Sequence, residues 1–430
     1  MTLLKKTAVI LLLLLVAGMA IVPCVSAGEI SQLKVLNQDL IELNYIPVET
    51  AREQATITML SMIHSGALDE NWSGAKINPA YEEIFDVNGE RLFYQFSVEK
   101  NGKRIGEIYG AASKVLGSPV ITIGSINEPE WAENLKEYPR NAVKEKFSGY
   151  DIISVKNVCF DYPFIGAMIT VINTKTGEEK SVIIDSRDGS EKNIDTQVSS
   201  YYNQIPPEEM QKRVAIWEQH NTAMEELKTA ILSENPGFLT KYSDMEVSRI
   251  NEVITNAKTR DSNIKALLLQ DGMRILSGLS HRTQYTDVWC GVATAQIIST
   301  RYMNPEWGQY HIADKMGAYY PDGTPKGTTP VMELIYYTAS QASGGLGKAS
   351  SYDIYRPFTT WEAARDEIEN NRIPFKIGRD TPNYHARACN GWMVNGGNPY
   401  LLFYDPGISG SIYWEYVAPG STYNNFVYVR

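Results

Sequence analysis

Apolar positions in the N-terminal part of the chain change from a helical to a strand spacing near residue 81. Between residues 29 and 74 the apolar residues recur with the spacing of one buried helix face. From Tyr81 they alternate with polar residues, and the pairs Asn88-Gly89 and Asn101-Gly102 are typical of hairpin turns. The pattern predicts a helical segment followed by a β-meander.

Two further changes of pattern divide the middle of the chain. Residues 149–187 return to the strand spacing, which predicts either a second copy of the first module or the rest of one larger sheet. Helix-forming residues dominate between residues 199 and 272, and Pro206-Pro207 marks the start of a first helix. A second helical run begins near Asp244. This stretch is expected to be either a helical spacer or an arm that lies across the last domain.

The last part of the chain, from about residue 275, mixes helical and strand patterns. An apolar run over residues 292–298 predicts a helix, and a Gly/Pro-rich loop follows over residues 320–330. The other expected elements are helices over 310–316 and 361–370 and strands over 374–378, 384–394, 400–404, 412–417 and 426–429. The whole chain is therefore expected to have an α+β fold.

Cys290 stands at the start of the apolar helical run, where a thiol meets unpaired backbone N–H groups and the positive end of the helix dipole. Both favour the thiolate and lower the pKa of the thiol. Gly291 is expected to leave room for a substrate carbonyl, whose oxygen would face the Cys290 N–H. Gln284 lies upstream in a loop that can fold its side-chain amide back as a second donor to an oxyanion. The alternative is a buried structural cysteine.

A base for this thiol is available downstream. His385 lies near the start of one expected strand, and Asp405 ends the next strand after a Gly-Gly-Asn-Pro turn. A two-strand hairpin can bring the Asp405 carboxylate beside the His385 imidazole, where it would fix the tautomer and stabilise the imidazolium. The order Cys, His, Asp supplies a nucleophile, a base and a group that orients the base.

The catalytic half resembles the papain-like cysteine peptidases, especially the compact branch that includes the bacteriocin-leader-processing (double-glycine) peptidases and their secreted relatives. Two departures stand out: the spacing from Cys290 to His385 is shorter than in papain itself, and Arg387 places a charge in a strand that is usually apolar. The residues that carry the resemblance are Gln284, Cys290-Gly291, Thr360-Trp361, Asp366-Glu367-Ile368, Arg372-Ile373-Pro374, His385-Ala386, Gly391-Trp392 and Asp405-Pro406.

The resemblance implies a secreted cysteine peptidase that forms a thioester. The long segment that precedes Cys290 leads us to expect, in addition, that the chain is made as a zymogen. The N-terminal part resembles PepSY-type and streptopain-type propeptide modules in its helix and its Asn-Gly hairpins. The expected domains are a signal peptide (1–27), an α+β propeptide-like region (28–200), a helical linker (201–274) and a papain-like domain (275–430). An amidase, a cell-wall peptide hydrolase or a transglutaminase would use the same residues, whereas a non-catalytic extracellular binding protein would not need them.

The first residues have the parts of a secretory signal. Lys5-Lys6 is a basic start, Ala8 to Val22 is an apolar run, and Val25-Ser26-Ala27 offers small residues for cleavage before Gly28. The run is short for a stable transmembrane helix. We therefore expect an extracytoplasmic protein, with an uncleaved anchor as the alternative.

Cleavage would remove Cys24 and leave three cysteines, so an odd count predicts at least one free thiol. Pairing of Cys159 with Cys389 remains open at this level. No spacing of cysteine and histidine suggests a metal site, and no cofactor is expected.

The composition and net charge of the chain limit the classes of partner that it can be expected to bind. Hydrophobic residues make up 43% and charged residues 21% of the chain, which is typical of a globular protein with a sizeable core. The net charge of −10 argues against a nucleic-acid partner. The expected partner is a peptide or protein substrate, with no membrane contact apart from the signal segment. No feature of the sequence indicates an oligomeric state.

Overall fold

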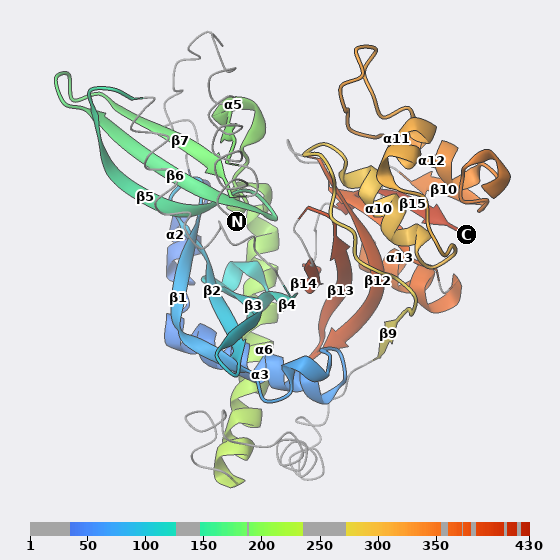
Figure 1. The fold of residues 1–430 in the computed structure, drawn as a ribbon. Coiled ribbons are helices and arrows are strands. Elements are labelled where there is room, and N and C mark those ends of the chain that lie inside the picture. Colours follow the sequence, from blue (N-terminus) through green and yellow to red (C-terminus); the bar gives the residue numbers. More distant parts are fainter. Residues whose placement is uncertain are drawn as a thin grey trace.

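The computed structural model describes residues 35–125, 147–186, 189–234, 272–353, 360–371, 373–379, 384–407, 411–418 and 423–430. Helices pack on a large, mostly antiparallel sheet, which confirms the expected α+β class. The signal segment and the second helical run from Asp244 lie outside the described residues. Within the described residues, one 15-stranded sheet passes through both halves of the chain (Figure 1).

The N-terminal half is a meander covered by helix α3 (Val48–His64). The expected hairpin turns are present: Asn101 and Gly102 both adopt positive φ, 53° and 73°, as a two-residue turn between paired strands requires. The first strand begins earlier than the alternation indicated, at Lys76. The elements before the gap are α2 (Gln38–Leu43), η2 (Glu70–Trp72), β1 (Lys76–Asp86), β2 (Arg91–Lys100), β3 (Lys103–Ala111), η3 (Lys114–Leu116) and β4 (Val120–Ser125).

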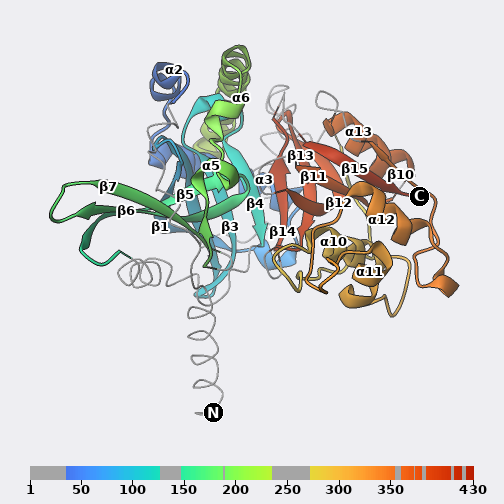
Figure 2. The same ribbon diagram turned by 90° about the horizontal axis from the view of Figure 1, so that it is seen from above.

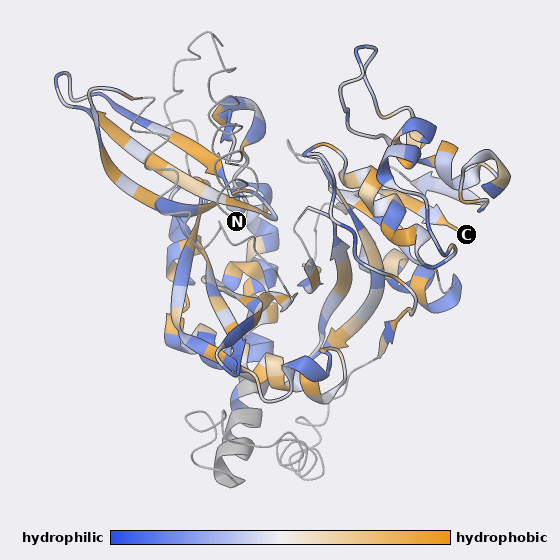
Figure 3. Ribbon diagram, in the orientation of Figure 1, coloured by the Kyte–Doolittle hydropathy of each residue, from blue (hydrophilic) through white to orange (hydrophobic). Residues whose placement is uncertain are grey.

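Within the segment 149–187, the described residues continue the same sheet and are not a separate copy of the first module. Strand β1 pairs in parallel with β5 (Tyr150–Asp161) over Ile84 to Asp86. Figure 3 shows hydrophobic residues recurring along these strands, whose apolar sides form a small cluster of their own. The strands that follow are β6 (Phe164–Asn173), β7 (Glu179–Asp185) and β8 (Glu191–Lys192), with helix α5 (Ile194–Gln197) and η5 (Tyr202–Gln204) after them.

Helix α6 (Pro207–Glu234) begins at the expected Pro206-Pro207 pair and packs against the N-terminal half. Met210 and Trp217 on this helix are buried in the same core as α3 and the meander. His220 also forms a hydrogen bond with the backbone of Gly396, in the turn of a hairpin from the C-terminal half. The described part of α6 therefore belongs to the core of the N-terminal half.

The C-terminal half places helices on both faces of its strands. Figure 2 shows α10, α11 and α12 on one side, while α13 packs on the other against β12 and β13. The helices are α10 (Cys290–Ser299), α11 (Gln309–Met316), α12 (Pro330–Thr338), η7 (Gln341–Ser343) and α13 (Thr360–Asp366), continued by a π-helical turn η8 (Glu367–Asn371). The strands are β9 (Met273–Ile275), β10 (Ser350–Asp353), β11 (Phe375–Arg379), β12 (His385–Asn395), β13 (Asn398–Asp405), β14 (Ser411–Tyr416) and β15 (Tyr423–Val429).

Three details of this half differ from the sequence patterns. Helix α12 and strand β10 were not expected. The sequence patterns also did not indicate β9, whose residues Met273 to Ile275 pair with β12, or the further backbone hydrogen bond that the Leu276 N–H donates to β12. Ser277 and Gly278, which follow, are exposed. The buried Leu276 side chain packs this segment against the sheet.

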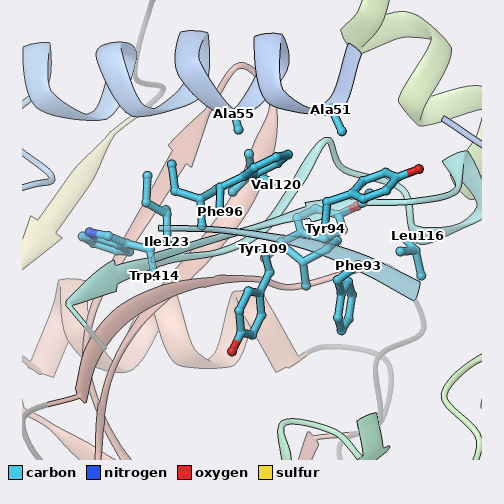
Figure 4. Close-up of a cluster of buried hydrophobic side chains, with 14 of the residues drawn as sticks. Ala51, Ala55, Phe93, Tyr94, Phe96, Tyr109, Leu116, Val120, Ile123 and Trp414 are labelled. Carbon is cyan, nitrogen blue, oxygen red and sulfur yellow. The ribbon is translucent and has the colours of Figure 1, made fainter. Parts of the chain in front are cut away.

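The two halves meet through strands β4 and β14. Their antiparallel register runs from Ser125 opposite Ile412 to Thr122 opposite Glu415. Figure 4 shows Trp414 among the buried side chains of the N-terminal meander, and its indole N–H donates to the Ala67 carbonyl at 2.8 Å. The halves therefore share one sheet and one apolar core.

Candidate active site

Cys290 is the first residue of α10, as expected from the sequence, and the whole helix from Cys290 to Ser299 is buried. The start of this helix is tightly packed. A Cβ atom at position 291 would overlap Thr328 Oγ1 and crowd Glu333 Oε1. The space that Gly291 leaves is therefore filled by these two side chains and is not open to a substrate, which corrects the expectation for this glycine.

The structure brings His385 and Asp405 to the same end of two paired strands. His385 begins β12 and Asp405 ends β13, the strand that pairs with it, so both lie at the same end of this hairpin. His385 Nε2 lies 2.7 Å from Asp405 Oδ1. Because Nε2 is engaged by the carboxylate, Nδ1 is the imidazole nitrogen left to face the nucleophile. The Cys290 thiol forms a hydrogen bond with His385, so the three side chains form one connected set.

The pKa values of this set favour an ion pair between thiolate and imidazolium. Burial alone would raise the pKa of the Cys290 thiol, but the hydrogen bond and positive charge of His385 outweigh it and leave that pKa below its ordinary value. Burial lowers the pKa of His385, whereas the charge and hydrogen bond of Asp405 raise it to about 9. The pKa of Asp405 is lowered despite its burial, chiefly by the charge of His385.

Asp405 is held by neighbours that the sequence did not indicate. The Gly407 N–H donates to Oδ1 at 2.8 Å, and the Tyr413 hydroxyl donates to Oδ2 at 2.7 Å. Arg387 Nη1 in turn donates to the Tyr413 hydroxyl at 2.9 Å and pairs with Glu415. The positive charge of Arg387 in β12 is thus paired with Glu415 in β14. Two hydrogen bonds through the Tyr413 hydroxyl also connect Arg387 to Asp405.

Gln284 lies next to the triad, but its side-chain amide is used locally. Its backbone N–H donates to the Pro406 carbonyl at 2.9 Å, directly after Asp405 in the chain. Its side-chain Nε2 donates to the Thr286 carbonyl at 2.8 Å. The structure thus positions the residue at the site, and its role as an oxyanion donor remains a prediction. In the same segment, His281 Nε2 is 2.6 Å from the Asp405 carbonyl.

A buried charge pair lies beside the start of α10. Lys376 Nζ is 3.1 Å from Glu333 Oε2, and both side chains are fully buried. The Thr328 hydroxyl donates to Glu333 Oε1 at 2.7 Å. The charge of Lys376 also helps to lower the pKa of Cys290. The only sequence signal for this pair was a lysine within an otherwise apolar strand.

An aromatic ring from the N-terminal half contacts the His385 imidazole. The ring centroids of Phe164 and His385 are 4.9 Å apart, with the planes at 67°. Phe164 begins β6 and is 6% exposed. Cys290, His385 and Asp405 are only 7%, 3% and 2% exposed. The assembled triad is therefore shielded from solvent in this conformation.

The other cysteines contribute no disulfide. Cys159, Cys290 and Cys389 are all buried and no disulfide joins any two of them, so the Cys159–Cys389 pair left open by the sequence does not form. Burial raises the pKa of the Cys389 thiol to about 12, in contrast to the lowered pKa of Cys290. Of Cys290 and Cys389, Cys290 has the electrostatic environment of a nucleophile.

Searches against protein-family models and characterised proteins identify no relative of this chain. No protein-family model matches the chain, and a search of characterised proteins finds no significant match. Among the described helices, none has both the length and the apolar character needed to cross a membrane.

Proposed function

We propose that the chain is an exported cysteine peptidase of the papain-like type. The observation that carries this proposal is the hydrogen-bonded set of Cys290, His385 and Asp405, in which the thiol pKa is lowered and the imidazole pKa raised. Such an opposed pair of shifts is the arrangement that nucleophilic catalysis by cysteine requires.

The proposed route passes through a thioester. The Cys290 thiolate attacks the carbonyl carbon of a peptide bond, and the carbonyl electrons move onto oxygen. As this intermediate collapses, the C–N bond breaks and the His385 imidazolium gives its proton to the leaving amine. His385 then takes a proton from water as the water oxygen attacks the thioester carbon, and the C–S bond breaks to release the acid and the Cys290 thiolate. The route uses no cofactor.

Two donors are proposed for the oxyanion: the Cys290 backbone N–H and the Gln284 side chain. Gln284 has to release the Thr286 carbonyl, or use its second amide hydrogen, to serve in this role. The Tyr413 and Arg387 contacts support the proposal by holding Asp405 in one orientation.

The proposal includes synthesis as a zymogen, with the N-terminal half as the restraining part. Its support is the shielding of the triad by Phe164, together with the sheet that the two halves share. The prediction is that a fragment of residues 275–430, if it folds, hydrolyses more substrate per mole than the mature chain. Residues 28–200 added to it should inhibit weakly.

A covalent probe tests the nucleophile. An epoxide or vinyl sulfone should label Cys290, with labelling lost in His385→Ala because the thiol then loses the hydrogen bond and the charge that most lower its pKa. Labelling at Cys159 or Cys389 instead, or equal labelling in the variant, would contradict the proposal. Comparing denatured protein, wall peptides and amine acceptors as substrates would separate a peptidase from the related acyl-transfer activities. A pure binding protein should turn over none of them.

A further inference from the structure

Phe164 lies where the proposed chemistry needs part of the substrate. His385 gives its proton to the leaving amine, so the substrate residue that carries this amine must sit against the imidazole. In the folded chain the imidazole is contacted by the Phe164 ring at a centroid distance of 4.9 Å. A substrate residue and Phe164 cannot occupy that position together.

The ring is presented by a well-anchored tip between β5 and β6. Phe160 stacks with Phe164 at a centroid distance of 6.2 Å and an interplanar angle of 24°. The Ser199 hydroxyl donates to Asp161 at 2.6 Å. The Tyr162 and Thr122 hydroxyls are 3.1 Å apart. All these anchors belong to the N-terminal half, whereas His385 belongs to the other.

The receiving side is already assembled. His385 keeps its 2.7 Å contact with Asp405 and its hydrogen bond with Cys290 while Phe164 lies against it. The ring therefore covers the imidazole without displacing it. The group that occupies this place against the imidazole is a flat aromatic ring.

We propose that Phe164 fills the subsite for the substrate residue on the leaving-group side of the scissile bond, and that this subsite selects an aromatic side chain. The inference rests on the proposed peptidase function. It adds the substrate class, peptides with an aromatic residue directly after the cleaved bond. It also makes the chain's own β5–β6 tip a competitor of that substrate.

The test uses the full mature chain, its Phe164→Ala variant and a matched control, Met168→Ala, which truncates another side chain of the same apolar cluster further along β6. The substrates are two quenched peptides that differ only in Phe or Ala after the scissile bond. Phe164→Ala should raise kcat/KM for the Phe peptide by about tenfold or more, since the competent fraction limits the apparent affinity. In the same variant, kcat/KM for the Ala peptide should rise by a smaller factor. Met168→Ala should leave kcat/KM for both peptides at the wild-type value.

Two outcomes would overturn the inference directly: an equal rise in kcat/KM for the two peptides in Phe164→Ala, or no rise for either. A loss of activity in Phe164→Ala would also overturn it, because the ring would then be a support for His385. A second measurement is independent of hydrolysis. Iodoacetamide should alkylate Cys290 faster in Phe164→Ala, and phenylalanine amide should slow that alkylation by refilling the vacated place. If no peptide is cleaved by any variant, the proposed function fails, and protection by phenylalanine amide, or its absence, still decides for or against the subsite.

Discussion

Tyr413 receives a hydrogen bond from Arg387 and gives one to Asp405, so its hydroxyl has a fixed direction. This matters because a carboxylate that can rotate would not hold one tautomer of His385. The sequence could indicate Cys290, His385 and Asp405, since their order and their position at element ends carry the signal. It could not indicate Tyr413, which was one of many tyrosines in the C-terminal tail.

The first prediction concerns the nucleophile. Cys290→Ala and Cys290→Ser should abolish hydrolysis while circular dichroism and the unfolding midpoint stay close to wild type, because the change is small. Hydrolysis by Cys290→Ala at the wild-type rate would remove Cys290 from the mechanism. Gln284→Ala should lower kcat by about 10²–10³-fold if its amide serves the oxyanion. An unchanged kcat would remove only Gln284.

The second prediction is a pH dependence. The pKa of Cys290 is lowered by His385 against the effect of burial. Removing the imidazole removes the two largest effects that oppose burial, so in His385→Ala the alkylation rate of Cys290 should rise only near or above the pKa of an ordinary thiol, about 8.5. At pH 7 the variant should react about tenfold or more slowly than wild type. Superimposable pH profiles would show that the imidazole does not set the pKa of the thiol.

At the scale of single elements, hairpins and the nucleophile helix were predictable because their signals are local. Asn-Gly turns require positive φ, and the apolar run after Cys290 gives a fully buried helix. Helix α12 also had a local signal: Thr329 caps it by accepting from the Met332 N–H, and Pro330 stands at its start. The surrounding Gly/Pro-rich composition hid that signal.

The third prediction concerns the ion pair between β12 and β14. Arg387 and Glu415 are both buried, with Nη1 and Oε2 2.5 Å apart. Arg387→Met or Glu415→Leu should each lower the free energy of unfolding by about 3–5 kcal/mol, because one buried charge is left unpaired. The double variant Arg387→Met/Glu415→Leu should recover much of this loss. Additive losses in denaturant titrations would contradict the coupling.

At the scale of the whole molecule, the junction of β4 with β14 and the contact of Phe164 with His385 had no sequence signal. Both contacts join residues from opposite halves of the chain. The spacing of apolar residues along a strand does not indicate which other strand pairs with its edge. The patterns therefore predicted separate regions, whereas the structure shares one core among them. The domain limits drawn from the sequence remain a prediction.

The fourth prediction tests this junction. A Cβ at Gly124 would lie within 2.4 Å of backbone atoms of Ile412 and Tyr413. Gly124→Ala should therefore push the strands apart and cost about 1–3 kcal/mol of unfolding free energy. Gly308→Ala is the control, since nothing lies within 4 Å of its Cβ and its φ is −71°. Equal unfolding midpoints for the two variants would contradict the register of β4 and β14.

Because β4 pairs with β14, cleavage of the chain between its two halves would not by itself separate them. If a protease recognition sequence is placed between the exposed Ser277 and Gly278 and then cleaved, β9 stays bonded to β12 and β4 to β14. The two pieces should elute together from a sizing column and part only in denaturant. Maturation would then be a matter of dissociation as well as cleavage. A freshly separated C-terminal piece would also carry an unpaired β14 edge prone to self-association.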